Sequence, residues 1–173
     1  MTSKLALFPL ALLLAGCAYP VVDVPDKLKP GPNESLAMIA HARGVQIYEC
    51  RAGKDRAGEY QWTFVAPEAD LFDVRGTRIG RHYAGPHWES TDGSKILGTP
   101  KARVDAPLAD SIPWLLLSAK SVGSNGELSG VTSIQRVSTA GGIAPDSGCS
   151  HAAAGRTARA DYTADYYFFT SGK

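Results

Sequence analysis

The chain has 173 residues, of which 44% are hydrophobic, and it carries 18 basic and 17 acidic side chains, for a formal net charge of +1 at pH 7. This balance excludes the strongly basic surface of a typical nucleic-acid-binding protein, so we expect no nucleic-acid partner. No block of like charges indicates an interaction tail.

The N-terminus has the layout of a secretory signal. Lys4 is followed by an apolar run over residues 5–14 and then by small residues, the order expected of such a signal. The run is much shorter than the about 20 apolar residues that span a bilayer, which excludes an uncleaved transmembrane anchor. We therefore expect residues 1–16 to be a signal peptide, which leaves about 157 residues, close to the usual size of one domain.

Residues 14–17, Leu-Ala-Gly-Cys, resemble the lipobox of bacterial lipoproteins. This resemblance implies that Cys17 is lipidated, with acyl chains such as palmitate that hold the mature protein on a membrane. In lipoproteins of this type an Asp after the cysteine favours the inner membrane, and Ala18 stands there in this chain. We expect an outer-membrane lipoprotein that faces the periplasm, with an inner-membrane or a soluble secreted protein as alternatives.

Proline dominates the segment after this cysteine, with Pro20, Pro25, Pro30 and Pro32. Proline fixes the backbone and removes hydrogen-bond donors, which favours an extended chain. We predict that residues 17–33 are a lipidated, proline-rich tether and that residues 34–173 form the folded domain.

The domain is rich in short strand patterns separated by glycine and proline. Residues 35–42 are compatible with either a short helix or a first strand, because so few residues do not fix a period. Asp92-Gly93 predicts a type I′ hairpin turn, and residues 141–155 are expected to form a long loop. Strands are expected at residues 45–50, 60–64 (ending at Pro67), 76–83, 87–91, 94–98, 112–118, 130–138 and 162–169.

Eight or nine such strands, spaced by about 8–12 residues, indicate an all-β fold. We predict a single-domain sandwich or barrel with little helix. The spacing alone does not separate these two architectures.

Cys50 and Cys149 remain once Cys17 is assigned to the lipid. An even pair of cysteines in an oxidising compartment predicts a disulfide. A free, nucleophilic thiol is the alternative, and it requires an activating environment.

The densest polar cluster in the chain is residues 82–92. If residues 84–86 reverse the chain, His82 and His87 could converge with Glu89, and this ligand set would suit a transition metal with an open position. The same side chains, with Asp92, are candidates for general acid–base catalysis. Alternatively, they are ordinary strand and turn residues. No motif requires a cofactor, so we expect none, with a transition metal as the minor alternative.

Aromatic side chains recur along the predicted strands and favour either a filled core or a ligand cavity. Tyr60 and Trp62 stand two residues apart and so share one face of their predicted strand, and Trp88 lies in the polar cluster. We take these three as candidate ligand-binding residues.

Most of the mature domain resembles an uncharacterised family of bacterial lipoproteins and fungal secreted proteins, known only as a domain of unknown function. The resemblance implies a secreted domain and carries no catalytic residue. A weaker likeness, through Tyr48-Glu49-Cys50, is to small periplasmic lysozyme inhibitors. The stretches that resemble the family are residues 44–50 (GVQIYEC), 80–89 (GRHYAGPHWE), 92–94 (DGS), 112–117 (IPWLLL), 134–137 (IQRV) and 162–167 (YTADYY).

From these patterns we favour a non-enzymatic envelope lipoprotein that binds a small ligand or a partner in the cell envelope. The alternatives are a secreted enzyme, with or without a metal, centred on His82, His87 and Glu89, and a protein similar to the lysozyme inhibitors. The sequence indicates no oligomeric state.

Overall fold

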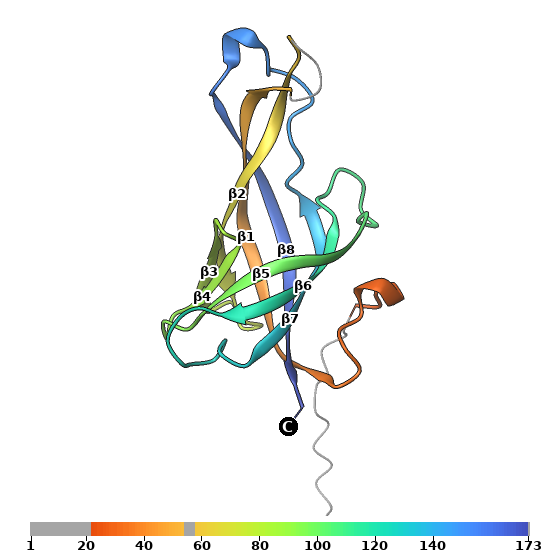
Figure 1. Ribbon diagram of the computed structural model, residues 1–173, viewed down its shortest axis with the longest axis vertical. Coiled ribbons are helices and arrows are strands. Elements are labelled where there is room, and N and C mark those ends of the chain that lie inside the picture. Colours follow the sequence, from red (N-terminus) through yellow and green to blue (C-terminus); the bar gives the residue numbers. More distant parts are fainter. Residues whose placement is uncertain (1–21, 54–57, 173) are drawn as a thin grey trace, which may run out of the picture.

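The computed structural model describes residues 22–53 and 58–172, and its strands form one antiparallel sheet that closes into a barrel (Figure 1). The predicted all-β fold is confirmed, as a barrel and not a sandwich. The expected signal peptide and Cys17 lie outside the described residues. The elements are η1 (Asp26–Leu28), β1 (Glu34–Ala52), β2 (Tyr60–Phe72), β3 (Arg78–Tyr83), β4 (His87–Ser90), β5 (Lys95–Val104), β6 (Trp114–Ser121), β7 (Val131–Gly141), η2 (His151–Ala153) and β8 (Thr157–Ser171).

Each strand pairs with its neighbours in chain order, and the last strand closes the ring on the first. β1 and β8 pair along almost their whole length, from Glu34 opposite Ser171 to Glu49 opposite Thr157. β1, β2 and β8 are long and rise together beyond the rest of the barrel, whereas β3 and β4 are short (Figure 1). The barrel wall is therefore taller on one side than on the other.

The short β3–β4 hairpin leaves part of the wall open. β2 pairs with β3 only from Ala69 onwards, so residues 60–68 of β2 pair with β1 alone. β5 pairs with β4 only as far as Leu97, so residues 99–104 of β5 pair with β6 alone. A lateral opening between β2 and β5 lies beyond the turn that joins β3 to β4.

Three sequence predictions are corrected by the strands as observed. Residues 35–42 and 45–50 belong to one strand, β1, so the short helix is wrong. β2 does not end at Pro67, because this residue pairs with Gln46 in the part of β2 that has no second neighbour, where proline is tolerated. The turn at Asp92-Gly93 joins β4 to β5 as predicted, but only Gly93 has a positive φ, so it is not type I′.

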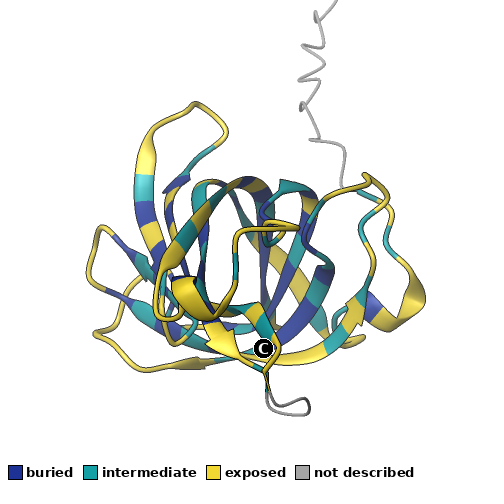
Figure 2. Ribbon diagram, turned by 90° about the horizontal axis from the view of Figure 1, so that it is seen from above, coloured by how far each residue is buried: buried dark blue, intermediate teal, exposed yellow. Residues whose placement is uncertain are grey.

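Alternate residues of the strands point into the barrel and fill its lower part. Trp88, Ile96, Ile134, Tyr166 and Phe168 are all fully buried there. Seen from above, the buried positions line the ring of strands, while exposed positions gather in the loops (Figure 2). An eight-stranded barrel is just wide enough for side chains to fill.

A second apolar cluster lies on the outside of the barrel. Tyr167 and Phe169, which alternate with the inward residues of β8, pack with Trp114 against residues from the N-terminal segment. In that segment Leu28 is completely buried, and its carbonyl accepts a hydrogen bond from Nε2 of Gln135 at 2.7 Å. The described part of the predicted tether, residues 22–33, is thus packed on the barrel and not extended away from it.

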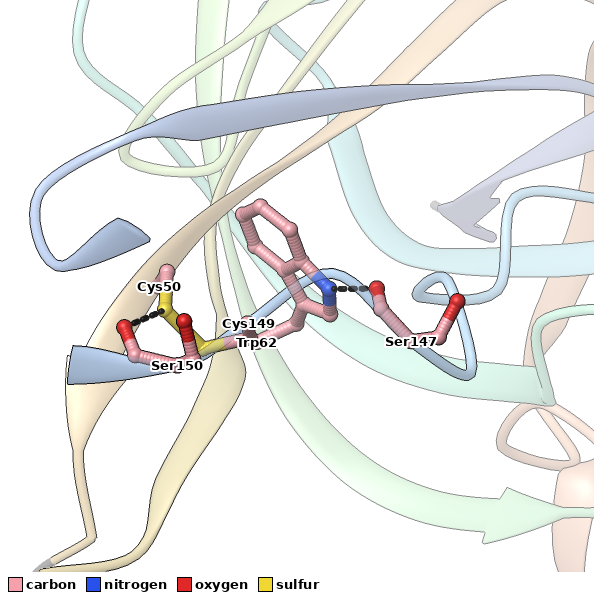
Figure 3. Close-up of a disulfide and its surroundings, with 5 residues drawn as sticks. All are labelled: Cys50, Trp62, Ser147, Cys149 and Ser150. Carbon is pink, nitrogen blue, oxygen red and sulfur yellow. Dashed lines mark hydrogen bonds between the residues drawn. A yellow bond between two sulfur atoms is a disulfide. The ribbon is translucent and has the colours of Figure 1, made fainter. Parts of the chain in front are cut away.

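The disulfide between Cys50 and Cys149 is confirmed (Figure 3). It joins β1 to the long loop between β7 and β8 across a sequence separation of 99 residues. The indole of Trp62 in β2 donates a hydrogen bond to the carbonyl of Ser147 at 2.8 Å, in the same loop. Both contacts hold this loop against the tall side of the barrel.

Replacing both bridged cysteines, C50S/C149S, is expected to lower the free energy of unfolding by about 4 kcal/mol. The reason is that a cross-link closing a loop of this length restricts the unfolded chain strongly. Urea unfolding under oxidising conditions measures the difference, and reduced wild-type protein is the control. Equal stability of the variant and the oxidised wild type would contradict the prediction.

Leu28→Ala tests whether the N-terminal segment is part of the fold. Removal of a completely buried leucine side chain is expected to cost about 3 kcal/mol of unfolding free energy, measured by urea denaturation. Leu108→Ala is the matched control, because Leu108 is 58% exposed and its loss should cost less than about 0.5 kcal/mol. If the two variants are equally stable, the segment behaves as a free tether.

Candidate functional site

A cavity of about 440 Å³ opens at the gap between β2 and β5. This volume falls in the range of pockets that hold small molecules, roughly 300–1,000 Å³. The lining residues come from every strand of the barrel and from the β3–β4 turn: Gln46, Phe64, Val65, Pro67, His82, Gly85, Pro86, Trp88, Pro100, Leu115, Leu117, Arg136 and Tyr166.

The walls of this cavity are mostly apolar. Leu115 and Leu117 of β6 lie two apart, so strand alternation points both toward the same side of the sheet. At the mouth, Phe64 and Val65 of β2 are 50% and 44% exposed. Exposed large apolar side chains beside a hollow are typical of a binding surface.

Three rings form the floor of the cavity. The imidazole of His82 stacks on the indole of Trp88 with ring centroids 4.1 Å apart, and both rings meet Tyr166 edge-on, at 5.1 and 5.3 Å. Gly98 makes room for this arrangement, because a Cβ there would come within 2.6 Å of the Trp88 ring. The floor is therefore fixed by packing.

His82 is neutral in this setting. Burial is the main cause that lowers its pKa from 6.5 to about 3, helped by the charge of Arg136 and opposed by a hydrogen bond to the carbonyl of His87. Nδ1 of His82 lies 2.8 Å from that carbonyl oxygen, which can only accept, so Nδ1 carries the proton. The second ring nitrogen, Nε2, is the unprotonated one.

Arg136 is the one charged residue that lines this cavity, and it also lines a second cavity of about 420 Å³. The two cavities share Gln46, Phe64, Leu115 and Arg136, so these side chains lie between them. The guanidinium donates two hydrogen bonds to the carbonyl of Pro113, at 2.8 and 3.1 Å. Among the described residues no carboxylate pairs with it.

Two further N–H groups at the cavity lack partners. Nε2 of Gln46 and Nε1 of Trp88 are buried and make no hydrogen bond in the described part of the chain. Buried polar groups are normally paired, so each exception calls for an explanation. Both residues line the cavity.

The structure does not bring His82, His87 and Glu89 together. Tyr83 is paired with His87 across the β3–β4 ladder, and paired residues share a face, so His87 lies on the face opposite His82. There its Nδ1 bonds the carbonyl of Ala84 at 2.7 Å. Within residues 22–53 and 58–172, no three His, Cys, Asp or Glu side chains are grouped so as to hold a metal ion.

Glu89 and Asp92, the two acidic candidates, have structural partners. The Glu89 carboxylate accepts hydrogen bonds from Arg81 and from the hydroxyl of Tyr83 on the outer face of the sheet. The Asp92 carboxylate binds the backbone N–H groups of Ser94 and Glu127, both at 2.8 Å. These bonds, with that of the Ser94 hydroxyl, lower the pKa of Asp92 to about 2 and join the β4–β5 turn to the β6–β7 loop.

The three aromatic candidates separate into two places. Trp88 lines the cavity, whereas Tyr60 and Trp62 line a smaller hollow beside the disulfide. Gln46 and Arg136 were not among the site residues predicted from the sequence. Both could have been found from strand alternation. Gln46 and Arg136 are polar, whereas the residues two positions away on the same faces of their strands, Tyr48 and Ile134, are apolar.

Comparison with known proteins gives one match. The model of a family described as a protein of unknown function, DUF3455, matches residues 30–170. No curated protein and no solved structure gives a significant match. In the described part of the chain, no helix is long and apolar enough to cross a membrane.

The neutral state of His82 predicts a pH dependence of stability. Between pH 6.5 and about 3 the unfolded chain binds a proton at His82 that the folded chain does not. Stability is therefore fully present above pH 6.5 and falls as the pH drops, by up to about 1.4 kcal/mol per pH unit. Urea unfolding of the wild type and of His82→Phe at pH 7.5 to 4.5 measures this contribution.

In His82→Phe the slope should decrease, because the ring remains and the titrating nitrogen is gone. His151→Phe is the control, since His151 is exposed and its ring contacts only that of Tyr60 among the aromatic pairs. An unchanged slope in His82→Phe would show that His82 titrates normally in the fold.

Proposed function

This chain belongs to DUF3455, a family of proteins of unknown function, and we propose that it is a non-enzymatic binding module whose barrel holds a small, largely apolar ligand. The observation that carries the proposal is the cavity of about 440 Å³ above a filled barrel core. A hollow of this size with mostly apolar walls is the usual form of a small-molecule site, and burial of apolar surface favours an apolar ligand there.

The location of the site supports the same proposal. The cavity lies at an opening of the barrel wall that the β3–β4 hairpin is too short to cover. Its floor is rigid, with His82 stacked on Trp88, and its mouth carries the exposed apolar residues Phe64 and Val65. A fixed base with an apolar rim suits a ligand that enters from the side.

We further propose that the module works in the cell envelope, anchored to the outer membrane by lipid on Cys17 and facing the periplasm. The lipobox-like residues 14–17 and the short apolar run before them support this placement. The Cys50–Cys149 disulfide fits it, because such bonds persist in oxidising compartments.

No comparable observation favours the enzyme. That alternative was based on His82, His87 and Glu89, but His82 lies on one face of the sheet and the other two on the opposite face. Both histidines bond backbone carbonyls, and Glu89 bonds Arg81 and Tyr83. The lysozyme-inhibitor alternative rests on a three-residue likeness, and the comparisons add nothing to it.

The experiment is a titration of the purified protein with N-phenyl-1-naphthylamine, a neutral apolar fluorophore. We expect saturable binding, with energy transfer from Trp88 because that indole lines the cavity. Leu115→Trp should weaken binding at least tenfold, because the larger side chain occupies the space between the two cavities.

Leu108→Trp is the matched control, since Leu108 lies in an exposed loop away from the cavity, and it should bind like the wild type. Circular dichroism establishes that both variants are folded. Lack of saturable binding by the wild type, or undiminished binding by folded Leu115→Trp, would refute the proposal.

A further inference from the structure

We infer that the ligand is an amphipathic acid, whose anionic group pairs with Arg136 while its apolar body fills the cavity. This inference rests on the proposed function and adds the chemical class of the ligand. It is carried by the charges and hydrogen-bond donors that line the two connected cavities.

The first observation is that Arg136 is positioned but not neutralised. Nε and Nη2 both donate to the Pro113 carbonyl, which fixes the plane of the guanidinium. Ion pairs of other arginines in the described part of the chain, such as Arg78 with Asp70 and Arg81 with Glu89, lie on the outer surface. Arg136 projects into the barrel and has no such partner among residues 22–53 and 58–172.

The second observation is the absence of acidic side chains around Arg136. The described residues that line the two cavities include Arg136 and Arg103 but no aspartate or glutamate. His82 is neutral at the floor and does not offset this charge. Arg136 is half-buried between mostly apolar walls, which remove part of its solvation, so a negatively charged group is the partner that it favours.

The third observation is that the Arg136 side chain offers hydrogen-bond donors only. Besides the two bonds to the Pro113 carbonyl, its guanidinium has further N–H groups and no site that accepts. A carboxylate is an acceptor only, with two oxygens that suit the fork of an arginine. A neutral alcohol or an amine offers less to this set of donors, and an ammonium group is repelled by Arg136.

The volume limits the size of the apolar body. A cavity of about 440 Å³ holds about 15 groups of the size of a water molecule, at about 30 Å³ each. A straight-chain carboxylic acid of about ten to twelve carbon atoms has a matching number of heavy atoms. Decanoate is therefore a suitable probe.

The test compares three ten-carbon probes at pH 8 by calorimetry: decanoate, 1-decanol and decyltrimethylammonium. We expect the wild type to bind decanoate at least tenfold more tightly than 1-decanol, and the cation most weakly. In Arg136→Gln this preference should disappear, so that decanoate and 1-decanol bind about equally, and circular dichroism establishes that the variant is folded.

Arg78→Gln is the matched control, since Arg78 is paired with Asp70 on the outside of the barrel, and it should keep the full preference for decanoate. Arg136→Lys should keep a reduced preference, because it retains the charge but not the fork of donors. If Arg136→Gln does not fold, the order of the three probes on the wild type and the result with Arg136→Lys decide the question.

The outcomes separate the two proposals. Wild-type protein that binds neither decanoate nor 1-decanol would refute the binding function itself. Protein that binds 1-decanol as tightly as decanoate, or an Arg136→Gln variant that keeps the preference for the acid, would overturn only the assignment of the ligand as an acid.

Discussion

The pairing of β8 with β1 is the constraint on which the rest of the structure depends. Closure of eight strands fixes the width of the interior, which side chains can then fill. Because β3 and β4 are short, closure is complete only in the lower part, where Trp88, Ile134 and Phe168 pack. In the upper part the same sheet holds inward-pointing residues around an unfilled space, and the candidate site exists for this reason.

The chemistry of the site follows from which polar residues the closed sheet turns inward. Burial makes His82 neutral and part of the floor, whereas Arg136 lies at a junction of two cavities whose described lining includes no aspartate or glutamate. The paired charges Arg81 and Glu89 lie outside, on the other face of the β3–β4 hairpin. The Arg81–Glu89 pair on the surface is thus neutral as a whole, whereas the charge of Arg136 within the barrel is not offset by a described carboxylate.

Much of the fold was predictable, because alternation and turn residues are local properties. The strands and the disulfide were found, the latter from the number of cysteines and not from geometry. The β3–β4 and β4–β5 hairpins were also predictable from their turns, whereas the pairing that closes the barrel was not, since Glu34 pairs with a residue 137 positions away. The site depends on register: because Tyr83 and not His82 opposes His87, the two imidazoles lie on opposite faces of the sheet, and nothing local in residues 82–88 decides this.

The lateral opening between β2 and β5 has a consequence for kinetics. Residues 60–68 and 99–104 are each hydrogen-bonded to one neighbouring strand and not to each other, so widening the gap between them breaks no ladder. Phe64 and Val65 on its rim are exposed, and exposed side chains change rotamer in picoseconds to nanoseconds, so they would not slow the passage of a ligand. A ligand could therefore enter and leave without the separation of any two hydrogen-bonded strands.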